Sequence, residues 1–135
     1  LPISPQGYEP DAAIVSGALK VAAVTGSTIT LCNDPLLAAE QADVLYTDVW
    51  ASMGRETEQN IRKVAFAGYQ INSEVMNVAK ADAIVLHCLP AHRGEEITDE
   101  VMESTQSVVF DQAENRLHVQ KAIMVLLMKQ RTKSL

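Results

Sequence analysis

The sequence lacks the glycine-rich segments with which nucleotide-binding proteins hold phosphate. It has no Gly-x-Gly-x-x-Gly segment and no glycine-rich loop that ends in Lys-Ser or Lys-Thr. These segments form the phosphate-binding turns of dinucleotide-binding dehydrogenases and of P-loop enzymes. A dehydrogenase is therefore disfavoured, and measurable NAD binding would be needed to support one.

Positive charge, long apolar runs and cysteine are also scarce. The 11 Lys and Arg residues are outnumbered by 17 Asp and Glu residues, and the net charge of −6 disfavours nucleic-acid binding by phosphate neutralisation. No apolar run approaches the length that spans a bilayer, and residues 1–5 lack the basic stretch of a signal peptide. Cys32 and Cys88 are too few for a disulfide framework, which favours a reducing compartment, the cytoplasm or an organelle matrix in a eukaryote.

Short apolar strands alternate with helical segments along the 135 residues, which are enough for one domain with a core. This alternation predicts an α/β fold, a doubly wound, mainly parallel, Rossmann-like sheet with helices on both faces. The chain has no initiator Met and opens like the tail of a strand, so we expect it to be part of a larger protein. Strands are predicted over 28–32, 43–47, 83–86 and 107–110, and helices over 12–24, 36–41, 55–67, 72–79, 99–103 and from a capping box at Asp111 to about Met128.

Reactive polar side chains follow two of the predicted strands. His87 and Cys88 come directly after the strand at 83–86, and Asp48 comes directly after the strand at 43–47. In open parallel sheets, ligands bind at the carboxyl ends of the strands. The sequence therefore predicts one site that is built from two loops.

The first loop offers groups that suit an amino-acid ligand. The carboxylate of Asp48 can bind an ammonium group, the hydroxyl of Ser52 can bind a ligand, and Met53 can form an apolar wall. The alternative is a solvated Asp48 and a Ser52 that caps the next helix.

The second loop contains Cys88, whose thiolate could act as a nucleophile or metal ligand. A covalent mechanism with His87 is disfavoured because adjacent residues of a strand point to opposite faces. Zinc is disfavoured because no His-x-x-x-His or Cys-x-x-Cys pattern accompanies the pair. A buried structural cysteine is the alternative. Residues 91–96 could form a substrate lid or a solvated turn.

Arg116 is predicted near the beginning of the last helix, where the helix dipole favours acidic residues. Its guanidinium could bind an anion or a developing oxyanion. A surface ion pair with Glu114 or Asp111 is the alternative.

Four segments together resemble the ornithine carbamoyltransferase family, and the resemblance covers essentially the whole chain. They are Gly-Tyr-Glu-Pro-Asp at 7–11, the segment 43–54 with its Asp-Val-Trp-Ala-Ser-Met-Gly core, His-Cys-Leu-Pro-Ala-His-Arg-Gly-Glu-Glu at 87–96, and Val-Phe-Asp-Gln-Ala-Glu-Asn-Arg-Leu-His at 109–118.

The resemblance implies transfer of the carbamoyl group from carbamoyl phosphate to the δ-amine of L-ornithine, which gives L-citrulline and phosphate in arginine metabolism. Asp48, Ser52 and Met53 would hold ornithine, while Cys88, the Leu89 backbone and Arg116 would face the carbamoyl group. Asp48, Cys88 and Arg116 would be the catalytic residues. Neither a metal, an organic cofactor nor a covalent enzyme intermediate is implied.

The resemblance also implies that residues 1–135 form a partial ornithine-binding domain. The carbamoyl-phosphate domain and the opening strand–helix–strand of the ornithine domain would be missing, so the isolated chain is expected to be inactive. The larger protein would be a homotrimer. Two rivals remain: a sister enzyme that acts on putrescine or an acylated ornithine, and a non-catalytic fragment that binds an amino acid.

Overall fold

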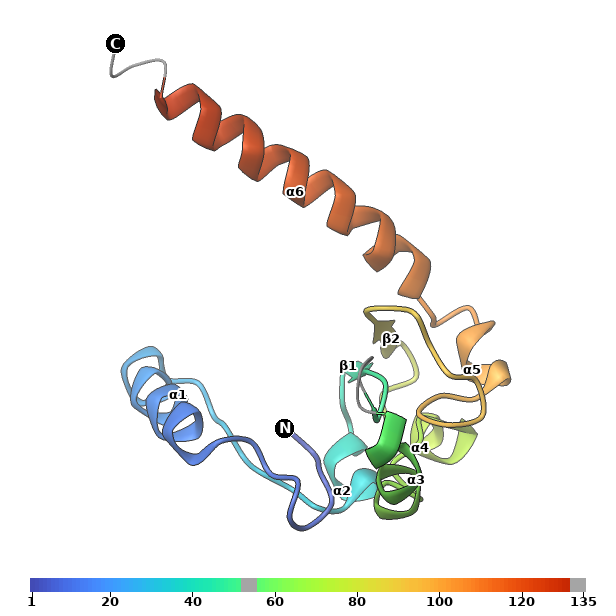
Figure 1. The fold of residues 1–135 in the computed structure, drawn as a ribbon. Helices are drawn as coiled ribbons and strands as arrows, with labels where there is room; N and C mark the ends of the chain where they lie inside the picture. Colours follow the sequence, from blue (N-terminus) through green and yellow to red (C-terminus); the bar gives the residue numbers. More distant parts are fainter. Residues whose placement is uncertain (52–55, 132–135) are drawn as a thin grey trace.

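The centre of the fold is a pair of parallel strands, seen side by side in Figure 1, in a computed structural model that describes residues 1–51 and 56–131. Strand β1 (Val44–Thr47) pairs with β2 (Ile84–His87) in a register that sets Thr47 beside His87. Alternate side chains of each strand are buried, as expected when one face of a sheet packs on a core. The predicted parallel α/β class is confirmed.

The strand predicted at 107–110 is shorter than expected. Ser107 forms an isolated parallel bridge with Val85, and the chain then enters α6 (Val109–Arg131). The predicted helix start at Asp111 is therefore wrong, because this acid lies inside the first turn, where it complements the helix dipole. The strand predicted at 28–32 is likewise reduced to one bridge, between Ile3 and Cys32. A β-branched segment forms a ladder only where a neighbouring strand pairs along its length.

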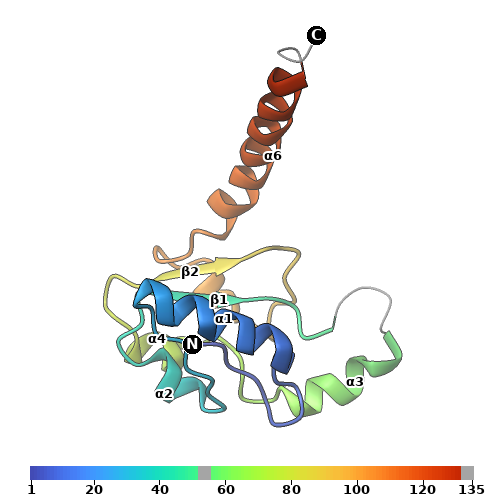
Figure 2. The same cartoon turned by 90° about the vertical axis from the view of Figure 1, so that its left-hand side faces the viewer.

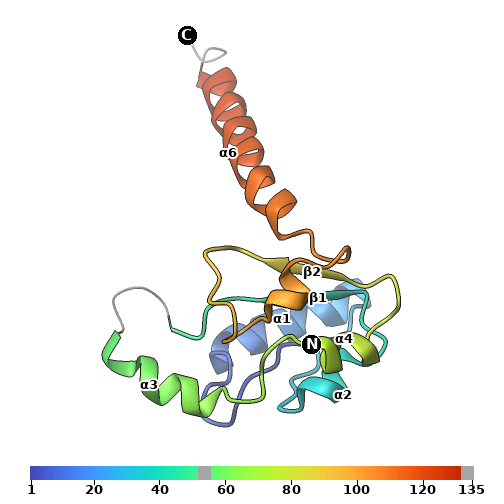
Figure 3. The ribbon, with the colours of Figure 1, turned by 90° about the vertical axis from the view of Figure 1, so that its right-hand side faces the viewer.

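Short capped helices cover the buried face of the strands, as Figure 3 shows for α4 and α5. Asp34, Asn72 and Thr98 each accept a hydrogen bond from the first turn of the helix that follows, which ends the preceding loop at a defined residue. These helices are α2 (Pro35–Ala39), α4 (Ser73–Val78) and α5 (Asp99–Met102). The core between them and the strands contains Ala39, Leu45, Ile71, Val75, Ala79, Ala83, Val85, Ile97, Val101, Met102 and Val109.

The longest helices stand off from this core. Figures 1 and 2 show α1 (Ala12–Thr25) on the opposite side of the strands from α4 and α5, and α6 projecting away from the body. Both helices expose large apolar side chains, for example Val24 on α1 and Leu126 on α6. The remaining helix, α3 (Glu56–Ala65), follows the loop after β1. Within residues 1–51 and 56–131, no helix combines the length and the apolar character needed to cross a membrane.

Replacement of a core isoleucine tests the position of the core. Ile97 is fully buried, whereas Ile61 on α3 is 65% exposed. We expect Ile97→Ala to lower the free energy of unfolding by about 3 kcal/mol through lost burial and a residual cavity, and Ile61→Ala to change it far less. Urea denaturation of both variants provides the measurement, and equal losses would contradict the assignment.

Candidate functional site

The pairing of β1 with β2 brings the two predicted loops together. Asp48 and Cys88 are the first residues beyond the paired positions Thr47 and His87, so they leave the sheet at the same edge. The thiol of Cys88 lies 3.0 Å from Asp48 Oδ1 and donates a hydrogen bond to it. Because Asp48 Oδ1 also accepts from the Val49 amide at 2.7 Å, the carboxylate is oriented on its own loop. The structure thus brings together two of the predicted site residues.

The surroundings of Cys88 favour the protonated thiol. Burial raises the pKa of the Cys88 thiol, and the hydrogen bond and negative charge of Asp48 raise it further. A thiolate that acts as a nucleophile or metal ligand needs the opposite environment, with a nearby cation or helix N-terminus. Tyr46 lies two residues before Asp48 on β1, and desolvation followed by the charge of Cys88 raises the pKa of this phenol too. The group at this edge is therefore a carboxylate with neutral donors around it.

His87 is held by two hydrogen bonds inside the protein. Its Nδ1 accepts from the Leu89 amide at 2.9 Å, and its Nε2 lies 3.1 Å from Glu96 Oε1. These contacts assign the ring proton to Nε2 and leave neither nitrogen to act on Cys88. Both His87 and Glu96 have no exposed surface. The pair holds the loop after β2 through the Leu89 amide. This agrees with the expectation that the side chains of His87 and Cys88 point to opposite faces.

Leu89 has an unusual backbone that depends on His87. Its φ is +54°, a left-handed conformation that costs a side-chain-bearing residue about 1 kcal/mol, and the Leu89–Pro90 peptide is cis. Because the Leu89 amide donates to His87, the carbonyl is the backbone group of Leu89 left to meet a ligand. Such an oxygen can accept a hydrogen bond from an amine or amide.

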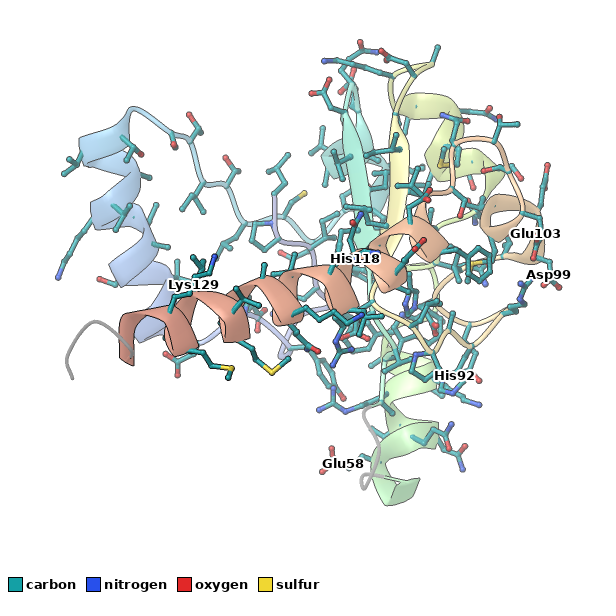
Figure 4. The ribbon with its side chains drawn as sticks, turned by 90° about the horizontal axis from the view of Figure 1, so that it is seen from above. Glu58, His92, Asp99, Glu103, His118 and Lys129 are labelled. Carbon is teal, nitrogen blue, oxygen red and sulfur yellow. The ribbon has the colours of Figure 1, made fainter. Side chains whose placement is uncertain are left out.

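Residues 91–96 include a turn that is exposed at His92, Arg93 and Gly94, as the solvated-turn alternative predicts, and the turn is anchored to its neighbours. Lys63 pairs with Glu95 at 2.7 Å, and the Ile71 amide donates to the Glu96 carbonyl at 2.9 Å. Arg93 bridges to α5, with Nη1 at 2.8 Å from Asp99 Oδ1 and Nη2 bonded to Glu103. Figure 4 shows Asp99 and Glu103 close together at the outer side of α5, with His92 on the loop nearer the centre.

No contact among the described residues joins Arg116 to Asp48 or Cys88, and its predicted role stays a prediction. It is exposed on α6, seven residues beyond the helix start instead of in its first turn, and it pairs with no described residue. The surface ion pair with Glu114 is not observed, since Glu114 meets His118 at 3.3 Å. Gln112, one turn earlier on the same helix face, acts to lower the pKa of Tyr46, against the larger effect of desolvation that raises it. The face of α6 that carries Arg116 is thus the one that begins at the site.

The predicted ligand residues Ser52 and Met53 lie outside the described residues. The described part of their loop ends at Ala51, after Trp50, whose ring stacks on Phe66 of the segment that follows α3 at 6.0 Å between centroids. Arg62 donates from Nη1 to the Trp50 carbonyl at 3.3 Å. The described portion of this loop is therefore fixed to α3 as well as to β1.

A donor set for a metal ion can be traced at the same edge. One ligand atom each from Asp48, His87 and Cys88 lies within 4.8 Å of the others. The fit to a metal is poor, because both ring nitrogens of His87 are engaged and the thiol of Cys88 is held in its protonated form.

Sequence reasoning missed the side chains that support the site. Tyr46 lies on β1 two residues before Asp48, and the alternation of side chains along an extended chain could have identified it. Glu96 is an acid next to an apolar position in a loop, and nothing in the local pattern shows that it is buried against His87. Arg62 and Gln112 act across the fold, and no local pattern identifies them.

Comparisons with known proteins agree on the family. The family model described as the Asp/Orn binding domain of aspartate/ornithine carbamoyltransferase matches residues 2–127. The ornithine carbamoyltransferase of Syntrophotalea carbinolica is 60% identical over 93% of this chain and 40% of its own length. The solved ornithine carbamoyltransferase of Pyrococcus furiosus is 52% identical, with a TM-score of 0.84 over 90% of this chain and 39% of its own. The anabolic ornithine carbamoyltransferase of Campylobacter jejuni is 41% identical, with a TM-score of 0.87 over 93% of this chain and 42% of its own. The chain spans about 40% of the length of the curated relatives it matches.

The protonated state of Cys88 can be tested by alkylation. We expect iodoacetamide to label Cys88 slowly at neutral pH and faster as the pH rises, because the thiolate reacts and the Cys88 pKa is raised. Asp48→Asn removes a charge that raises this pKa, so it should increase the labelling rate severalfold while Cys32 serves as the internal reference. Peptide mass mapping measures both rates, and an unchanged or slower rate at Cys88 would refute the assigned effect of Asp48.

The buried pair can be tested by truncation of its acid. Glu96→Ala leaves the buried Nε2–H of His87 without its acceptor, and we expect a loss of about 1–3 kcal/mol in the free energy of unfolding. Glu95→Ala is the matched control, since Glu95 is partly exposed and its ion pair with Lys63 contributes little. Equal stability of the two variants in urea would show that the His87–Glu96 bond is unimportant.

Proposed function

Because the chain belongs to the aspartate/ornithine carbamoyltransferase family, we propose that it supplies the amino-acid half of an ornithine carbamoyltransferase site. In this reaction the δ-amine of L-ornithine attacks the carbonyl carbon of carbamoyl phosphate, a C–N bond forms, and phosphate leaves. The products are L-citrulline and phosphate. The observation that carries the proposal is the 3.0 Å contact between Cys88 and Asp48, at the edge where β1 and β2 end.

Asp48 is the group that meets the amine of ornithine. A carboxylate attracts an ammonium group, and it can also accept the proton that the amine must lose before it attacks. Cys88 donates to the same carboxylate, so it sets which Asp48 oxygen is free for the substrate. The raised pKa of Cys88 disfavours the thiolate, and in this scheme no bond forms between Cys88 and the carbamoyl carbon.

The carbamoyl group is held from two sides. The carbonyl of Leu89 accepts from an N–H of the carbamoyl group, since its own amide is engaged with His87. The guanidinium of Arg116 stabilises negative charge on the carbamoyl oxygen as the amine attacks. Ser52 and Met53 hold the rest of the amino acid. In this scheme the protein aligns two substrates and stabilises charge.

The remaining parts of the site belong to protein outside this chain. The chain spans about 40% of its relatives, and no described cluster of cations provides a site for the phosphate of carbamoyl phosphate. We propose that a carbamoyl-phosphate domain supplies that site, that the complete protein is a homotrimer, and that the 135 residues alone do not catalyse the reaction.

Citrulline formation by the complete protein tests this function. We expect turnover with L-ornithine, and a loss of about 10²-fold or more in kcat/KM for Asp48→Asn and for Arg116→Gln. Asp82→Asn is the matched control, because Asp82 is an exposed acid before the opposite end of β2 and should leave turnover unchanged. The isolated chain should form no citrulline under the same conditions.

A substrate panel separates the rivals. Turnover of putrescine or N-acetylornithine in preference to ornithine would assign the chain to a sister carbamoyltransferase. If the complete protein binds norvaline, an ornithine-like amino acid without the δ-amine, yet turns over none of the amines, the chain serves as an amino-acid-binding module instead.

A further inference from the structure

Arg62 on α3 joins three segments that are distant in the sequence. Its Nη1 donates to the Trp50 carbonyl at 3.3 Å, in the loop after β1. Its guanidinium carbon lies 5.3 Å from the centre of the Tyr8 ring, in the turn near the N-terminus. A cation above an aromatic face is attracted by the ring quadrupole, so one side chain holds both segments against α3.

Aromatic rings complete the same contact. Phe66 lies at the centre, with Trp50 stacked on it at 6.0 Å and 29°, and with Tyr8 edge-on at 5.0 Å and 69°. Tyr69 meets Phe66 at 5.9 Å, and its hydroxyl donates to the Asn33 carbonyl at 2.6 Å. We call Tyr8, Trp50, Arg62, Phe66 and Tyr69 the aromatic clasp.

The clasp lies next to the proposed amino-acid site. Trp50 is two residues beyond Asp48, which is held on its other side by β1 and by Cys88. The loop is therefore fixed at both ends of a short segment. Apolar packing accounts for the stacked rings, but it does not account for a guanidinium that donates to a loop carbonyl while covering a second ring.

We propose that Arg62 is a positioning residue, which acts through the clasp to hold residues 48–51, the described part of the loop after β1, where Asp48 meets the amino-acid substrate. The inference rests on the proposed amino-acid site and deepens it. The hydrogen bond of Arg62 to Trp50 is charge-assisted, and its direction is fixed by the planar guanidinium. Loss of this bond frees the loop, and the amino acid must then order it again on binding.

Binding of norvaline to the complete protein tests the proposal without any need for catalysis. Titration calorimetry should give a dissociation constant about tenfold higher for Arg62→Gln than for the unaltered protein, as expected for loss of one charge-assisted hydrogen bond. Arg62→Lys keeps the charge near Tyr8 without the planar fork, so its affinity should be intermediate. Lys80→Gln is the matched control, because it removes one charge and one ion pair, with Asp43, at the opposite end of the strands.

Trp50 is the one tryptophan of the sequence, so its fluorescence reports on the clasp alone. Acrylamide should quench it more strongly in Arg62→Gln than in the unaltered chain or Lys80→Gln, while the far-ultraviolet circular dichroism stays the same. If Arg62→Gln does not fold, the norvaline affinity of Arg62→Lys is the test instead. An unchanged affinity in that variant overturns the proposal.

The other outcomes are also decisive. Unchanged quenching in Arg62→Gln shows that Arg62 does not hold the loop, and increased quenching with unchanged norvaline affinity shows a purely structural role; either result overturns the proposal. If the unaltered complete protein binds no norvaline, the proposal fails together with the placement of the amino-acid site. Failure confined to the Arg62 variants leaves that placement, and the proposed reaction, intact.

Discussion

The register between β1 and β2 is the constraint on which the site depends. Because Thr47 lies beside His87, the next residue of each strand, Asp48 and Cys88, leaves the sheet at the same edge and at hydrogen-bond distance. A slip of one residue would turn every side chain of a strand to the opposite face. Val85, which is fully buried, would then be exchanged for Ile84 or Leu86, neither of which is buried, so burial of the core and alignment of the site are enforced by the same pairing. Stability and function are therefore coupled through the backbone of these two strands.

The buried bond between His87 and Glu96 connects this pairing to the second loop. Burial of two polar side chains is costly unless they satisfy each other, and Glu96 Oε1 meets both the His87 ring and the His92 amide. Glu96 Oε2 is buried without a partner among the described residues, so the pair is not optimised for stability. The pair instead orders the loop after β2. Because Glu96 holds Nε2 of His87, Nδ1 is available to accept a hydrogen bond from the Leu89 amide. The left-handed backbone at Leu89 is thereby maintained where the carbonyl can serve a ligand.

Patterns of neighbouring residues predict most of the helices and strands. The features that they do not predict depend on contacts between residues that are distant in the sequence. Helices that begin at a capping side chain, as after Asn72 and Thr98, were predicted to within one or two residues because the cap acts within one turn. The start of α6 was misplaced because the bridge at Ser107, and not the capping-box pattern at Asp111, determines where the chain leaves the sheet. The convergence of Asp48 and Cys88 was predictable from strand order, since both follow parallel strands. The contact of Arg62 with Trp50 was not, because it depends on how α3 folds back over its own loop.

In the proposed reaction, the charge arrangement at the sheet edge makes positioning the main contribution of the described residues. A nucleophilic cysteine needs a lowered pKa, yet Cys88 lies partly buried beside the carboxylate of Asp48, which disfavours the thiolate. In the proposed reaction the nucleophile comes from the substrate, and the described residues contribute orientation, proton acceptance and stabilisation of charge. Orientation is sensitive to displacements well below the length of a hydrogen bond. For this reason we expect the two side chains that hold the loops, His87 and Arg62, to affect the proposed reaction, although neither is proposed to touch the reacting atoms.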